Sequence, residues 1–109
     1  MRRVVAAGLA FVLGCAAYQR GEGLDVATVP APLRADYELF AQRCSRCHSL
    51  SRPLNARVSS ESHWREYVTR MRRMPGSGIA PDDVPGLLRF LTWYSADRRA
   101  PDAGAGGSR

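Results

Sequence analysis

The feature that most constrains this chain is one short motif, Cys44-Ser45-Arg46-Cys47-His48. Residues three and four apart share a helix face, so the spacing predicts that both thiols and the imidazole project from one face of a helix. Two thiols placed in this way can bond the two vinyl groups of a haem while the imidazole binds its iron. The motif is typical of covalent haem c attachment, and it predicts a fold built around one large apolar group.

Two cysteines at this spacing have other uses, and these stay open on sequence alone. A thioredoxin-like redox pair would lie in a β-α-β pattern, but no strand-like alternation flanks the motif. A structural disulfide would need only the two cysteines themselves. A zinc site with four ligands would need a second pair of donors, which only His63 and a distant group could supply.

The N-terminus has the pattern of an export signal. Met1-Arg2-Arg3 precedes an apolar run of ten residues, 4–13, which is too short for a membrane span of about 20 residues. The sequence Val12-Leu13-Gly14-Cys15 resembles a bacterial lipobox. We therefore predict a signal peptide over residues 1–14 and a lipid on Cys15 that anchors the exported chain to a membrane in the periplasm. Simple cleavage further along the chain and an uncleaved anchor are the alternatives.

The rest of the chain divides into three predicted parts. Residues 15–32 show no apolar period and are predicted to be a flexible tether, and residues 100–109, rich in glycine, a disordered tail. Residues 33–99 then form the only domain that 109 residues allow. The whole chain contains only 3 Phe, 4 Tyr and 2 Trp, which is a thin supply for a self-sufficient core, so a staple such as a disulfide, a metal or a cofactor is expected.

Two helices are predicted after the motif. Ser60 caps a helix that runs to Met74, where Pro75 ends it, and a second helix opens at Pro81 with an apolar face. On the first helix Trp64, Val68 and Met71 recur at i, i+4 and i+7, which predicts a stripe that faces the haem ring, although methionine at such spacing is more often core packing.

The iron's sixth ligand is predicted to be methionine, which gives a higher reduction potential than histidine. Met71 is the first candidate and Met74 the alternative. His63, near the start of the helix, and an open sixth position are the remaining possibilities.

Together these segments resemble the small monohaem c-type cytochromes of bacteria over residues 33–95. The matching elements are Tyr37-Glu38-Leu39-Phe40 before the motif, then Trp64 to Val68 with Arg70 and Met71, and the helix after Pro81. The resemblance implies an all-α bundle of three to four helices around one covalent haem c, whose first and last helices cross.

The resemblance also implies particular roles for residues around the haem. Phe40 would pack on it with Trp64 and Val68, and a backbone carbonyl within residues 50–53 would orient His48. One departure is the short spacing from His48 to Met71, because many members of the family place the methionine in a longer loop.

The function implied is a single-electron carrier that works by outer-sphere transfer and is not an enzyme. Alternatives are a sensor or ligand-binding haem protein with a labile sixth position, and the haem-bearing small subunit of an oxidoreductase. All 16 basic residues are arginine, and the formal net charge is +6. A basic rim near the haem would attract an acidic redox partner, unless these arginines form only a solvated helix face. The arginines concerned are Arg57, Arg65, Arg70, Arg72 and Arg73. An exported haem protein meets no nucleic acid, and no small-molecule substrate is expected.

Overall fold

A computed structural model describes residues 23–99. Within this range the chain forms four α-helices and three short 3-10 helices, and it contains no strand. The all-α prediction is thereby confirmed. The predicted signal peptide, Cys15 and the predicted tail 100–109 lie outside the described residues. In chain order the elements are η1 (Val26–Thr28), η2 (Ala31–Leu33), α2 (Arg34–Cys44), α3 (Ser51–Leu54), α4 (Glu61–Arg73), η3 (Pro81–Asp83) and α5 (Val84–Arg99).

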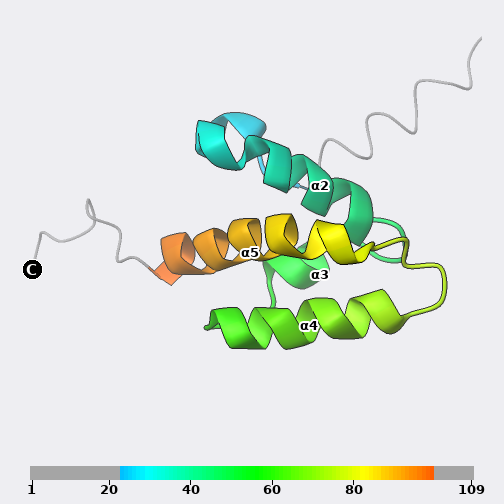
Figure 1. Cartoon of the computed structure of the whole chain (residues 1–109). Helices are drawn as coiled ribbons and strands as arrows, with labels where there is room; N and C mark the ends of the chain where they lie inside the picture. The colour runs from blue at the N-terminus through cyan, green and yellow to red at the C-terminus, as the bar shows by residue number, and fades with distance from the viewer. Residues whose placement is uncertain (1–22, 100–109) are drawn as a thin grey trace, which may run out of the picture.

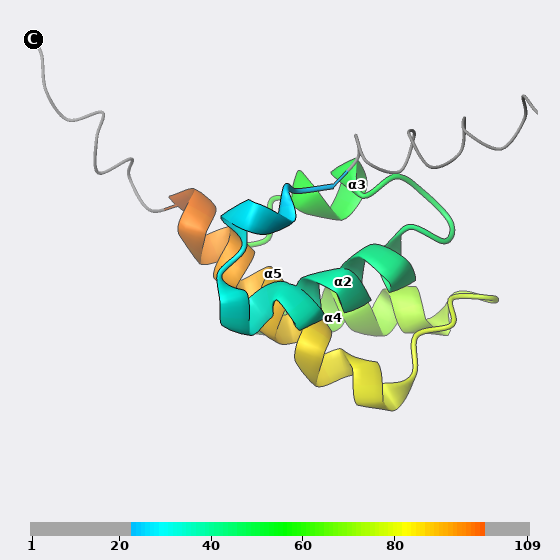
Figure 2. The ribbon, with the colours of Figure 1, turned by 90° about the horizontal axis from the view of Figure 1, so that it is seen from above.

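Helix α5 forms the centre of the fold, with α2 packed on one side and α4 on the other (Figure 1). Seen from above, α2 and α5 cross at an angle, so the predicted crossing of the first and last helices is confirmed (Figure 2). The crossing is filled by aromatic rings: Phe40 and Phe90 are fully buried, with ring centroids 4.7 Å apart. Burial of each such ring contributes about 1.5–3 kcal/mol to folding. None of the helices within residues 23–99 is long and apolar enough to cross a membrane.

Helix α4 has the boundaries that its sequence predicts. The Ser60 hydroxyl accepts a hydrogen bond from the His63 backbone N–H at 3.2 Å, which caps the first turn. The helix ends at Arg73, and Met74 is extended because Pro75 follows it. Inside the fold, the Trp64 indole N–H donates to the Ser95 hydroxyl at 2.7 Å and ties α4 to α5.

The packed part of the chain begins before Leu33, within the segment predicted to be a tether. Val29 is 1% exposed and belongs to the core. The Leu24 backbone N–H donates to the Tyr37 hydroxyl at 2.8 Å, and that hydroxyl donates to the Leu24 carbonyl at 3.0 Å. Leu24, Val29 and Tyr37 thus hold residues 23–32 on the bundle, although the sequence of this segment shows no helical or strand-like apolar period.

Candidate functional site

The Cys44–His48 motif lies at the end of a helix rather than along its face. Helix α2 ends at Cys44, and the next residues form a turn and bends. The expectation that all three side chains share one helix face is therefore wrong. The chain reverses here because the following segment buries Leu50 and Leu54, at 5% and 6% exposure, in the core.

The motif nevertheless contributes to one cavity. Cys44, Cys47 and His48 all line a hollow of about 400 Å³ whose wall is mainly apolar. This volume falls within the range of roughly 300–1,000 Å³ that is usual for cofactor sites. The rest of the wall comes from the end of α2, from α3, from α4 and from the segment after α4. These residues are Arg43, Arg52, Pro53, Tyr67, Met71, Met74, Pro75, Ser77 and Ile79.

The imidazole of His48 is half-buried, and its neighbour in the chain orients it. The Nδ1 atom lies 3.1 Å from the carbonyl oxygen of Ser49. When Nδ1 carries the proton it donates to this carbonyl, and Nε2 keeps the lone pair that a metal ligand needs. The orienting carbonyl is therefore that of Ser49 and not one within residues 50–53. It comes from the adjacent residue because the chain turns immediately after the motif.

The two thiols differ in their surroundings. Cys47 is exposed, whereas Cys44 is half-buried, and this burial raises the pKa of the Cys44 thiol to about 12. An unmodified Cys44 is therefore a neutral thiol at neutral pH and a poor nucleophile for disulfide exchange. Among residues 23–99, no three His, Cys, Asp or Glu side chains cluster closely enough to hold a bare metal ion.

Both methionines that follow the motif line the cavity. Met71 is half-buried in the last turns of α4, whereas Met74 caps the helix and is 54% exposed. His63 is exposed at the start of α4 and is not part of the wall.

The aromatic and aliphatic residues predicted to pack on a haem lie elsewhere. Phe40, Trp64 and Val68 belong to the hydrophobic core and are absent from the cavity wall. Their contact with a haem stays a prediction. The stripe on α4 is divided by depth, because Trp64 and Val68 are buried in the core and only Met71 lines the cavity.

Several residues of the cavity wall were not predicted from the sequence. For some of them, but not for all, the sequence pattern could have indicated the position. Tyr67 precedes Met71 by four residues, so helical spacing could have placed it on the same face. Burial raises the pKa of the Tyr67 phenol, while the guanidinium groups of Arg52 and Arg70 partly oppose the rise. Arg43 left no signal, because its partner Asp83, 2.7 Å away, lies 40 residues further along the chain.

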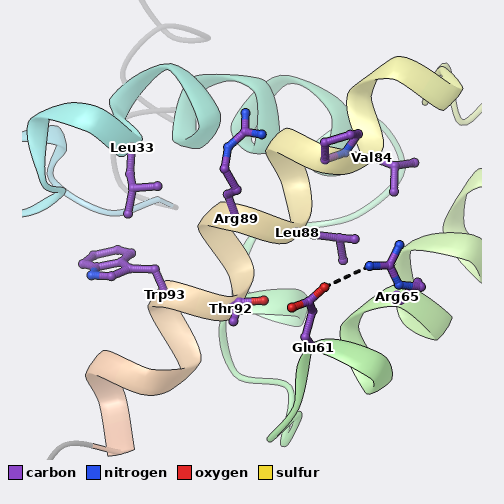
Figure 3. A pocket seen from close by; sticks show the side chains of 9 residues that line it. Leu33, Glu61, Arg65, Val84, Leu88, Arg89, Thr92 and Trp93 are labelled. Carbon is purple, nitrogen blue, oxygen red and sulfur yellow. Dashed lines mark hydrogen bonds and ion pairs between the residues drawn. The ribbon is translucent and has the colours of Figure 1, made fainter.

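A second hollow, of about 520 Å³, lies between α4, α5 and η2 (Figure 3). Its apolar floor includes Leu33, Leu88 and Trp93. The charged groups around it are paired within the chain: Arg65 binds Glu61 at 2.9 Å, and Arg89 binds Asp36 at 2.8 Å. It contains no thiol, imidazole or thioether, so the first cavity is the better candidate for chemistry.

No protein-family model, curated protein or solved structure matches this chain. Function is therefore inferred from the cavity and from the residues that line it.

Proposed function

We propose that this protein is an exported monohaem c-type cytochrome that carries single electrons between redox partners. The observation that carries the proposal is that Cys44, Cys47, His48 and Met71 line one apolar cavity of about 400 Å³. A bare ion needs far less space, since zinc lies only about 2.3 Å from its sulfur ligands. The apolar wall favours a large hydrophobic group that is held at several points.

The cysteines, the histidine and the methionines of the wall have distinct roles in this proposal. The thiols of Cys44 and Cys47 would hold a haem covalently by adding across its two vinyl groups, so that each sulfur gains a bond to carbon and each thiol hydrogen goes to the neighbouring carbon. His48 would hold the iron through Nε2, because Nδ1 lies 3.1 Å from the Ser49 carbonyl oxygen. Met71 is the proposed sixth ligand and Met74 the alternative.

One arginine of the wall is available to complete the binding of the group. Arg52 supplies a guanidinium group that could pair with a carboxylate of a haem, whereas the guanidinium of Arg43 is already bound to Asp83. A bound haem would supply an iron that alternates between the ferrous and ferric states, one electron at a time. Because His48 and a methionine would both hold the iron, no position on it would be left for a substrate, and electron transfer would be outer-sphere.

The absorption spectrum of the purified holoprotein tests this function. We expect low-spin spectra in both oxidation states, with no change on addition of carbon monoxide to the reduced protein, because two side chains fill the axial positions. Spectra that shift readily with the gas would contradict the carrier function. They would favour a sensor or ligand-binding protein whose sixth position is labile.

The proposed location of this carrier is the periplasmic side of a membrane, where a lipid on Cys15 holds it. Cys15 lies outside the described residues, so this part rests on the lipobox-like sequence alone. We expect Cys15→Ser to move the haem-bearing protein from the membrane fraction to the soluble periplasmic fraction. Haem content should not change, since the haem-binding cysteines are intact. A variant that stays with the membranes would rule out the lipid anchor.

A further inference from the structure

The second hollow, between α4, α5 and η2, is an apolar face of the fold that the proposed function does not use. Leu88 is 6% exposed in its floor, and Leu33 and Trp93 are half-buried at one end (Figure 3). Pro85 is exposed at the other end, in the first turn of α5. Pro85 and Trp93 are about two helical turns apart, so the apolar face follows α5 for about 12 Å.

The charged groups at the border of this hollow balance one another. Arg65 lies 2.9 Å from Glu61, and Arg89 lies 2.8 Å from Asp36. Each arginine therefore has a carboxylate beside it, and the four groups together carry no net charge. The chain as a whole differs, because its 16 arginines outnumber its 10 acidic residues and give a formal net charge of +6. Two copies of so basic a chain repel one another over surfaces rich in arginine, but not over this face.

An apolar face with balanced charges at its border suits a second copy of the same chain. In a two-fold dimer the same patch of each copy contacts its equivalent, so the patch must be complementary to itself. A face of a single sign would meet its own charge across the interface. A face with equal numbers of both signs meets no such repulsion, and it offers little electrostatic attraction to a partner that is strongly acidic or strongly basic.

The hollow and the cavity of the Cys44–His48 motif use different sides of α4. Glu61 and Arg65 border the hollow, whereas Tyr67 and Met71 line the cavity. Within residues 23–99, the two sets of lining residues have no member in common. A contact made through the hollow therefore uses none of the cavity wall, and each copy keeps its own cavity for the proposed cofactor.

We propose that two copies of this chain associate through the second hollow, with α5 of one copy against α5 of the other, to form a two-fold dimer. The inference goes beyond the proposed function and does not depend on a haem. Removal of the apolar floor from water drives the association. Trp93 of each copy supplies the aromatic contact that the centres of interfaces favour, and the two ion pairs stay hydrated at the border.

Sedimentation equilibrium of the full chain, in a detergent whose density matches that of the solvent, tests the dimer. We expect a particle with twice the mass of the chain, which dissociates on dilution. Pro85→Glu places a charge on the apolar face, and the fold should tolerate it because an acidic residue is favourable in the first turn of a helix. The control Val26→Glu makes the same change of charge at an apolar residue that is 40% exposed and lines neither the hollow nor the cavity. Circular dichroism checks that both variants keep their helices.

We expect Pro85→Glu to raise the dissociation constant of the dimer at least about tenfold, because the interface would bury a charge that has no partner. Val26→Glu should change that constant less than about twofold. Trp93→Ala, at the other end of the hollow, should also weaken the dimer about tenfold, since aromatic residues contribute strongly at interfaces. Equal dissociation constants for Pro85→Glu and Val26→Glu would overturn the proposed interface.

The mass of the unaltered protein gives the second way to overturn the dimer. A chain that remains a monomer at the highest attainable concentration contradicts it. So does a monomer that dimerises only after residues 100–109 are removed, because the chain's own C-terminal segment would then occupy the hollow in the natural protein. Haem content enters none of these results, so a chain without haem would overturn the proposed function and leave the dimer to be judged by its mass.

Discussion

Replacement of both motif cysteines, Cys44→Ser with Cys47→Ser, is expected to give a chain with no covalently bound haem. The physical reason is that each thioether needs its own sulfur, and a serine hydroxyl does not add to a vinyl group under the same conditions. We expect haem staining of the denatured protein to disappear completely. The free energy of unfolding should also fall, by about 2–5 kcal/mol, because an apolar wall built for a large group would be left without its contacts.

A matched control separates loss of the haem from general damage to the turn. Ser45→Ala changes an exposed residue between the same two cysteines and should leave haem staining and stability unchanged. The haem assignment would be contradicted if the unaltered protein carried no haem and instead bound one zinc ion through the two thiols. In that case the cysteine double variant would lose zinc instead, and the pair would be a metal site of another kind.

The helices that bear strong local signals could be predicted from the sequence. Ser60 and Pro75 define the two ends of α4, and Pro81 marks the entry to α5 through η3, because caps and prolines act within one helical turn. The apolar stripe on α4 could be predicted too, but how deeply each of its residues is buried could not. Trp64 and Val68 are buried in the core and only Met71 lines the cavity, a division that depends on tertiary packing rather than on the helical period.

Features that depend on distant contacts left no local signal. The end of α2 at Cys44 has neither glycine nor proline to mark it, and it follows from the burial of Leu50 and Leu54. The arginines of the cavity wall are a second example. The sequence pattern favoured arginines of α4 and of the loop before it, none of which lines the cavity, whereas Arg43 and Arg52 line it because the end of α2 and α3 meet there.

Met71→Ala is the variant that decides the sixth ligand, and Met74→Ala is its matched control. Both methionines line the cavity, but Met71 is half-buried on a helix, whereas Met74 is 54% exposed at the helix end. A thioether that is shielded from water and fixed by a helix can hold one geometry in both oxidation states. This difference in burial and position is why we propose Met71 ahead of Met74 as the sixth ligand.

We expect Met71→Ala to abolish the weak methionine-to-iron charge-transfer absorption of the oxidised protein. The reduction potential should fall by an amount on the order of 100 mV, a fraction of the roughly 0.8 V that axial ligands span, because a methionine ligand raises the potential. Met74→Ala should retain the absorption and the potential. If only Met74→Ala loses the absorption, Met74 is the sixth ligand, and the exposed end of α4 is part of the iron site. If the absorption is absent from the unaltered protein, neither methionine is a ligand, and the carrier would need another sixth group.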